Sequence, residues 1–127
     1  MDLPETLKYT ESHEWIADHG DGTVTVGITA VAAEQLGELV YVELPQVGAR
    51  VARGANCAVV ESTKAAAEVY APVAGEVIAA NAELAANPGR VNESPYGTGW
   101  LFKLKLADRA ELDGLLARDA YAKSAGV

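Results

Sequence analysis

The chain turns back on itself around one lysine in the sequence Val59-Val60-Glu61-Ser62-Thr63-Lys64-Ala65-Ala66-Ala67-Glu68-Val69-Tyr70-Ala71-Pro72. The residues beside Lys64 are small, and Lys64 is the only cation between Arg53 and Arg90. Apolar stretches on both sides, residues 57–61 and 67–71, predict two strands that meet at this lysine. A lysine at such a hairpin tip projects into solvent, as an enzyme that acylates an ε-amine requires. The sequence therefore predicts a protein that carries a swinging arm on Lys64.

Other short strand patterns surround this hairpin and predict an all-β sandwich or barrel. Residues 23–28 alternate with period two, which is typical of a half-buried strand, and the turn residues Gly20-Asp21-Gly22 precede them. Further strands are predicted over residues 39–44, 73–78 and 100–106.

A Pro-x-x-Gly turn that leads into a strand occurs twice, in residues 44–51 and in residues 71–78. The two units lie on either side of the Lys64 hairpin. This repetition predicts two similar halves related by an approximate twofold axis.

Helical patterns between the strands are few and short. Thr29 is the predicted N-cap of a helix over residues 30–36, and Gly37 is the residue at which that helix should end. Asn81 is the predicted N-cap of a short helical turn before Asn87-Pro88-Gly89 interrupts it.

Residues 108–125 are predicted to form a C-terminal helical appendage. Asp108 and Glu111 have the spacing of a capping box, with Asp in place of Ser or Thr. A last helix is predicted over residues 119–124. Between the two lies an apolar face made of Leu112, Leu115 and Leu116.

The composition excludes several classes of protein. A chain of 127 residues has room for one domain, which we predict to span residues 1–127 with its core in residues 9–106. The net charge of −8 argues against a nucleic-acid partner, because like charges repel. No stretch reaches the roughly 18 uncharged apolar residues that a membrane span requires, so no membrane partner is predicted.

The cysteine content and the N-terminus bear on the compartment. The single cysteine, Cys57, excludes an internal disulfide and favours a reducing environment. Residues 1–10 hold no apolar block and only one cation, Lys8, which argues against a secretory signal or a transit peptide. We therefore expect a bacterial cytoplasmic protein, or a mitochondrial matrix protein if the chain is a processed organellar one.

The remaining candidates for chemistry are interpreted as structural residues, so neither an enzyme active site nor a metal site is predicted. His13 and His19 lack a third ligand at metal spacing. Cys57 lies in an apolar strand pattern and is expected to be a small buried hydrophobe. Trp15 and Trp100 are expected to anchor the core.

An ordered set of motifs over residues 8–121 resembles one family. The motifs are Tyr9-Thr10, Ser12-His13-Glu14-Trp15, Val26-Gly27-Ile28-Thr29, Glu34-Gln35-Leu36-Gly37, Val40-Tyr41-Val42-Glu43-Leu44-Pro45, Val60-Glu61-Ser62 with Lys64-Ala65, Val69-Tyr70-Ala71-Pro72 with Gly75-Glu76-Val77, Val91-Asn92, Pro95-Tyr96-Gly97 and Gly99-Trp100-Leu101. Together they resemble the H proteins of the glycine cleavage system, the lipoyl carriers of a four-part complex.

The resemblance implies an all-β lipoyl-type barrel-sandwich hybrid of two antiparallel sheets, with the Lys64 hairpin protruding and a short C-terminal helical appendage. It also implies lipoate attached covalently to Lys64 of a non-catalytic carrier that shuttles an aminomethyl group derived from glycine. Three departures are modest: Thr63 stands where valine is usual, Ala67 where serine is frequent and Glu68 where aspartate is common. None of them removes the modified position.

The same resemblance implies an acidic cleft for the loaded arm, whose aminomethyl group is cationic and labile to water. The implied cleft residues are Ser12, Glu14 and Glu68, with Glu61 contributing from the hairpin. The implied partners are a pyridoxal-phosphate-dependent glycine decarboxylase, a folate-dependent aminomethyltransferase, dihydrolipoamide dehydrogenase and the enzymes that attach lipoate.

Other classes of protein fit the sequence less well. A biotin carrier typically has methionines beside its lysine, whereas Thr63 and Ala65 flank Lys64. A lipoyl domain of a 2-oxo acid dehydrogenase usually has Asp before its lysine and lacks the segment over residues 12–15. A stand-alone enzyme would need catalytic residues that the sequence does not offer. A lipoyl relay or interaction protein outside glycine cleavage would have the same hairpin, so this alternative stays open.

Overall fold

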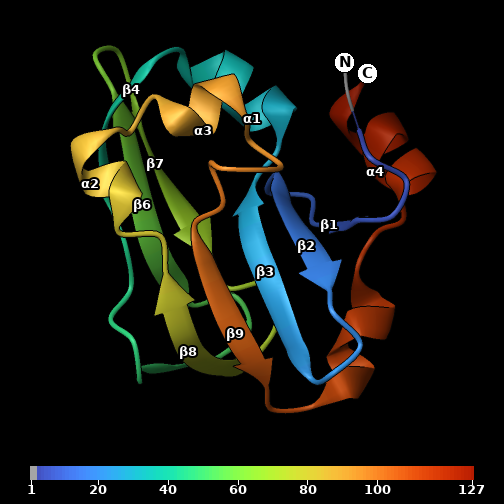
Figure 1. Cartoon of the computed structure of the whole chain (residues 1–127). Helices are drawn as coiled ribbons and strands as arrows, with labels where there is room; N and C mark the ends of the chain where they lie inside the picture. Colours follow the sequence, from blue (N-terminus) through green and yellow to red (C-terminus); the bar gives the residue numbers. More distant parts are fainter. Residues whose placement is uncertain (1–2) are drawn as a thin grey trace.

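The structure is a computed structural model that describes residues 3–127, so Met1 and Asp2 of the predicted domain lie outside the described residues. Its strands form two antiparallel sheets, one six-stranded and one three-stranded, with a shared hydrophobic core (Figure 1). The predicted all-β architecture of two antiparallel sheets is confirmed.

The six-stranded sheet has the order β1-β2-β3-β9-β8-β5, with β1 Lys8–Tyr9, β2 Glu14–Asp18, β3 Thr23–Ile28, β9 Phe102–Leu106, β8 Gly75–Ala80 and β5 Arg50–Val51. The three-stranded sheet has the order β4-β6-β7, with β4 Leu39–Glu43, β6 Asn56–Ser62 and β7 Ala66–Tyr70. The helices are α1 Ala30–Leu36, α2 Glu83–Ala86, α3 Arg90–Glu93, the 3-10 helix η1 Arg109–Gly114 and α4 Arg118–Ala125.

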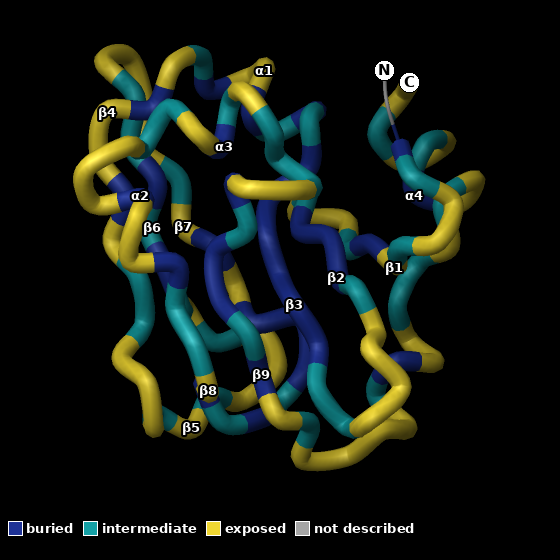
Figure 2. Tube along the Cα trace, viewed as in Figure 1, coloured by how far each residue is buried: buried dark blue, intermediate teal, exposed yellow. Residues whose placement is uncertain are grey.

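Strand β3 lies at the centre of the larger sheet and is buried along most of its length (Figure 2). The prediction that it is half-buried is wrong, because its second face is covered as well. On that face the ring of Trp15 lies over Gly27, and Nε2 of His19 is 2.7 Å from the hydroxyl of Thr25. Side chains of β2 and of the residue after it therefore cover the face that the alternation predicted to be exposed to solvent.

The predicted helix after β3 is confirmed at both ends. The hydroxyl of Thr29 accepts a hydrogen bond from the N–H of Ala32 at 3.3 Å, and Gly37 follows the helix with φ of 83°. The prediction for Asn81 is wrong, because α2 begins without a side-chain cap. The amide of Asn81 instead donates to the carbonyl oxygens of Thr98 and Trp100, each at 2.8 Å.

The C-terminal segment is helical as predicted, but its capping box is only half formed. Asp108 caps η1 by accepting from the N–H of Ala110 at 2.9 Å. Glu111 does not accept from the N–H of Asp108 as a capping box requires. Its carboxylate instead accepts from the N–H of Ala74 at 2.6 Å. The side chain that was expected to close a local cap therefore joins the segment to the start of β8.

This segment is also built into the body of the domain. Tyr9 and Leu116 exchange two backbone hydrogen bonds of 2.8 Å, which extends the larger sheet beyond β1. The rings of Tyr9 and Tyr121 stack with their centroids 4.7 Å apart. A second core cluster results, and its buried members are Leu3, Tyr9, Trp15, Val31 and Tyr121.

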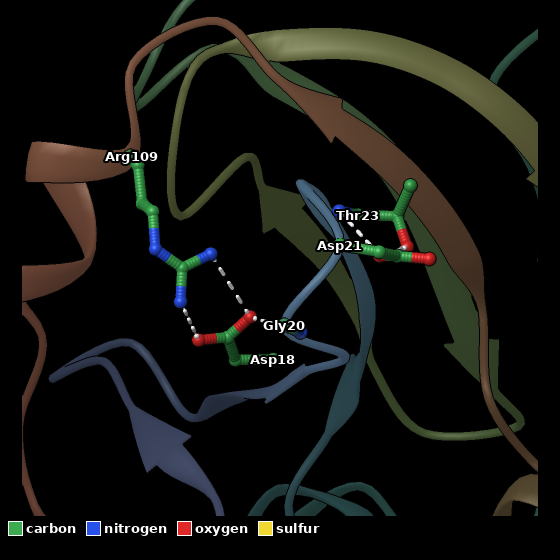
Figure 3. A network of polar contacts seen from close by, with 5 residues as sticks. All are labelled: Asp18, Gly20, Asp21, Thr23 and Arg109. Atoms are coloured by element: carbon green, nitrogen blue, oxygen red, sulfur yellow. Dashed lines mark hydrogen bonds and ion pairs between the residues drawn. The ribbon is translucent and has the colours of Figure 1, made fainter.

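One ion pair links the 3-10 helix to the turn between β2 and β3 (Figure 3). The guanidinium of Arg109 lies 2.9 Å from the carboxylate of Asp18, which also accepts from the N–H of Gly20. The Gly20 hydrogen bond and then the Arg109 charge hold the pKa of Asp18 below its usual range. Both ionic side chains are partly exposed, so we expect this pair to contribute little to the stability of the fold. Its main effect is to orient η1.

The two Pro-x-x-Gly units pair with each other through β5 and β8. Arg50 is opposite Glu76, and the antiparallel register places Ala49 opposite Val77. The N–H of Val77 does donate to the carbonyl of Ala49 at 2.8 Å. The two units are therefore antiparallel neighbours in the larger sheet, and the approximate twofold axis stays a prediction.

Gly27→Ala should destabilise the fold. A Cβ on Gly27 would lie 2.6 Å from the Nε1 and Cε2 atoms of Trp15. That ring is buried, and its N–H donates to the carbonyl of Pro95 at 2.8 Å, so it has no room to move away. We expect the free energy of unfolding in urea to fall by about 1–3 kcal/mol, the usual cost of overpacking.

Gly89→Ala is the matched control. Nothing lies within 4 Å of a Cβ at Gly89, and its φ of −63° suits any residue. Its stability should be unchanged or raised by up to about 1 kcal/mol. Equal destabilisation of the two variants would contradict the packing explanation.

Candidate functional site

Lys64 lies at the exposed tip of the β6–β7 hairpin, which protrudes beside α1 (Figure 1). The tip is closed by Ser62, whose N–H donates to the carbonyl of Ala65 at 2.7 Å. The hydroxyl of Ser62 accepts from the N–H groups of Ala65 and Lys64 at 3.2 and 3.4 Å. The side chain of Lys64 passes Gly37, where a Cβ would be 3.5 Å from Cε. The turn thus has a fixed backbone and an accessible amine.

A second group of polar residues surrounds the carboxylate of Glu14, which is only 1% exposed. The hydroxyls of Thr10 and Ser12 donate to its Oε1 at 2.5 and 2.6 Å. The N–H of Tyr70 donates to its Oε2 at 3.3 Å, from the edge strand of the other sheet. Burial raises the pKa of Glu14, and these three donors oppose that shift.

The loop that carries Thr10, Ser12 and Glu14 is held by its own backbone and by α4. His13 has φ of 73°, a left-handed conformation that is rare for a residue with a side chain. Its carbonyl accepts from the N–H of Thr29 at 3.0 Å, and its Nδ1 lies 2.7 Å from the hydroxyl of Tyr121. Burial lowers the pKa of His13, which favours its neutral form. The C-terminal helix therefore helps to fix the position of Glu14.

A cleft of about 500 Å³ opens beside this loop. Two of the predicted site residues, Ser12 and Glu14, line it. Its other lining residues are Tyr9, Thr10, Glu11, Arg53, Gly54, Tyr70, Ala71, Pro72, Glu111, Gly114, Leu115 and Leu116. Sequence reasoning missed Thr10 as a site residue, although the Tyr9-Thr10 motif contained it, and it missed Tyr70 because a backbone N–H leaves no sequence signal.

The other two predicted acids lie outside the lining of the cleft. Glu68 is exposed on β7, and its carboxylate accepts from the hydroxyl of Tyr70 at 3.1 Å. It thus contacts a residue that lines the cleft. Glu61 is opposite Tyr41 of β4 and Ala66 of β7, next to the residue that closes the turn. The structure brings Ser12 and Glu14 together, with Glu68 nearby and Glu61 apart.

The remaining polar candidates have structural surroundings. Burial raises the pKa of the Cys57 thiol to about 11, so it stays protonated and packs against the core. Trp15 is buried as expected, whereas Trp100 is only partly buried, with Nζ of Lys103 5.1 Å from its ring centroid.

In the part of the chain that the structure describes, no three His, Cys, Asp or Glu side chains form a set able to hold a metal ion. Within residues 3–127, the helices are too short or too polar to cross a membrane.

The fold and the site define a class of protein. Two packed antiparallel sheets with one lysine at the tip of a protruding hairpin are the architecture of lipoyl-type domains. The family model described as glycine cleavage H-protein matches residues 7–126. The chain belongs to this family.

Similar proteins match nearly the whole chain. A glycine cleavage system H protein of Laribacter hongkongensis is 55% identical, covering 98% of this chain and 98% of the relative. One of Nitrosomonas eutropha is 57% identical, covering 97% and 95%. The crystal structure of a glycine cleavage system H protein from Mycobacterium marinum is 40% identical, with a TM-score of 0.89, and covers 98% of this chain and 100% of that chain.

The stability of the Glu14→Gln variant, relative to the parent chain, should depend on pH. Burial raises the pKa of Glu14 in the folded chain, so the protonated carboxyl is favoured there over the carboxylate. This contribution to the stability of the folded chain is present at low pH and is lost as pH rises through the folded pKa. We expect Glu14→Gln to gain stability relative to the parent at pH 7, since no charge is then buried. The gain should shrink as pH falls through the raised folded pKa of Glu14 toward the usual carboxyl value, and it should not change further below that value. Urea unfolding at a series of pH values measures this, and a gain that grows toward acid would contradict it.

Proposed function

We propose that this chain is the carrier protein of the glycine cleavage system and that lipoate, joined by an amide bond to Lys64, is its swinging arm. The observation that carries the proposal is the position of Lys64 at an exposed hairpin tip in a member of this family. When attached, lipoate supplies a disulfide that can be reduced and loaded with an aminomethyl group. The chain supplies the position, the surroundings and the docking surfaces of that arm.

The turn fits an attached arm. Thr63, Lys64, Ala65 and Ala66 are all exposed, so no large side chain limits access to the amine. From Lys64 the alternating residues of β7 lead to Tyr70, about 20 Å away at roughly 3.3 Å per residue. Ala66, Glu68 and Tyr70 are exposed in this row. An extended lysine derivative can therefore lie back along the outer face of β7 toward the cleft.

The cleft fits a cationic amine. Ser12 and Glu14, which line the cleft, and Glu68, which contacts the lining residue Tyr70, are the proposed residues. Glu61 is left out because it lies beside the hairpin turn. A carboxylate has about four acceptor positions, of which the carboxylate of Glu14 uses three. One position and the negative charge thus remain for a cation. Leu115 and Leu116 add apolar walls that reduce contact with water.

The chain itself acts as a non-catalytic carrier in this proposal. Its partners are the pyridoxal-phosphate-dependent glycine decarboxylase, the folate-dependent aminomethyltransferase, dihydrolipoamide dehydrogenase and the enzymes that attach lipoate. A net charge of −8 suits brief, salt-sensitive docking to basic surfaces. Because similar relatives come from bacteria, we propose the bacterial cytoplasm as its location.

Lys64→Arg should abolish carrier activity and leave the fold intact, because it keeps the charge at an exposed site and removes the amine that is acylated. The assay is glycine cleavage with the purified partner enzymes, combined with peptide mass spectrometry. A lipoyl mass increment should appear only on the Lys64 peptide of the parent chain. Lys123→Arg, at another exposed lysine, should behave like the parent. An active Lys64→Arg protein would refute the arm.

A further inference from the structure

Two adjacent large apolar residues on β4 face solvent. Val40 is 54% exposed and Tyr41 is 49% exposed, although alternation along a strand would direct one of them inward. The pairing register shifts between Leu39 and Tyr41, as a β-bulge at Val40 requires. The bulge directs both side chains outward while Leu39 and Val42 stay buried. The exposure is thus built into the strand.

These residues lie beside the Lys64 hairpin. Strand β4 is an edge of the three-stranded sheet, and it pairs with β6. Tyr41 is opposite Glu61, and Leu39 is opposite Ser62, the residue that closes the turn. The side chain of Lys64 passes Gly37, just before β4 begins. The exposed pair is therefore next to the amine and not next to the cleft.

Acidic residues border the pair. Glu38 precedes it and Glu43 follows it, and both are exposed. Neither takes part in the ion pairs recorded for residues 3–127. We call Val40, Tyr41, Glu38 and Glu43 the β4 patch. Apolar residues with a polar rim mark interaction sites on soluble proteins.

The chemistry of the patch indicates its occupant. A second copy of this chain would bring Glu38 and Glu43 close to the same acids, in a protein with a net charge of −8. A partner with an apolar groove and a basic rim has the complementary charge. Of the enzymes that use the arm, only the one that attaches it reacts at the Lys64 amine itself. That enzyme must contact the surface beside the turn, whereas the others act at the distal end of the arm.

We propose that the β4 patch is the docking surface for the lipoate-attaching enzyme, an inference that rests on the proposed function. In the attachment step Nζ of Lys64 attacks the carbonyl carbon of a lipoyl-adenylate. The amide C–N bond forms, the bond from that carbon to the phosphate oxygen breaks, AMP leaves, and an amine proton passes to solvent. The patch holds the turn against the enzyme while this exchange occurs.

The test measures the rate of lipoylation of the unmodified chain by a purified lipoate–protein ligase with lipoate and ATP. The double variant Val40→Ser/Tyr41→Ser should raise KM about tenfold or more, as expected for loss of an apolar anchor. Its urea unfolding should match that of the parent, because both side chains are exposed. The matched control is Val47→Ser, which shortens a side chain that is 63% exposed in the loop between β4 and β5. The control should stay within about twofold of the parent.

A second pair of variants keeps the test decisive if the double variant fails to fold. Glu38→Lys/Glu43→Lys should raise KM, and added salt should reduce the difference from the parent. Glu5→Lys, at an exposed acid of the N-terminal segment, should leave KM unchanged. Equal effects of the Glu5 and the Glu38/Glu43 variants would overturn the proposed charge match.

The outcomes separate the two proposals. A parent chain that gains no lipoyl mass at Lys64 overturns the proposed function. If the Val40→Ser/Tyr41→Ser variant is lipoylated at the same rate as the parent, the proposed docking surface is overturned and the proposed function is not. The proposal also fails if the parent sediments as a dimer and the Val40→Ser/Tyr41→Ser variant sediments as a monomer. The patch would then be a self-association surface.

Discussion

The carboxylate of Glu14 joins three parts of the molecule, of which one is distant in sequence from the other two. It extends from β2 of the larger sheet, receives two hydroxyl donors from the loop before it, and accepts the N–H of Tyr70 from the edge of the smaller sheet. A buried carboxylate without such donors would cost several kcal/mol. Its charge is therefore tolerated only where the loop and the edge strand meet correctly, and this requirement fixes one wall of the cleft.

Strand β7 relates that wall to the hairpin. Its register with β6 sets Val60 opposite Ala67, and it leaves Glu68 and Tyr70 on the exposed face that begins at Lys64. A slip of one residue would turn this whole row inward and expose Val69, which is buried in the core. The buried residues of β7 thus determine which side chains an attached arm would meet.

Local patterns predicted the parts of the fold that depend on neighbours in sequence. The strand over residues 23–28 and the helix capped by Thr29 follow from period and capping, and the exposure of Lys64 follows from its small neighbours. Polar side chains with a choice of partners were less predictable. Asn81 and Glu111 were assigned to local caps, yet both bond to backbone groups of distant segments. Glu14 was singled out by resemblance, but its bond to Tyr70 spans 56 positions and has no local signal.

The exposed face of the smaller sheet carries both kinds of contact. Strands β4 and β7 flank β6, so their axes lie about 10 Å apart at roughly 4.8 Å per strand spacing. The register sets Tyr41 in line with Glu61 and Ala66, so the β4 patch and the row that leads to the cleft share one face. An enzyme held on β4 would therefore also cover the beginning of that row. In the proposed function the arm is attached before it is loaded, so the two contacts follow one another and the same face can serve each in turn.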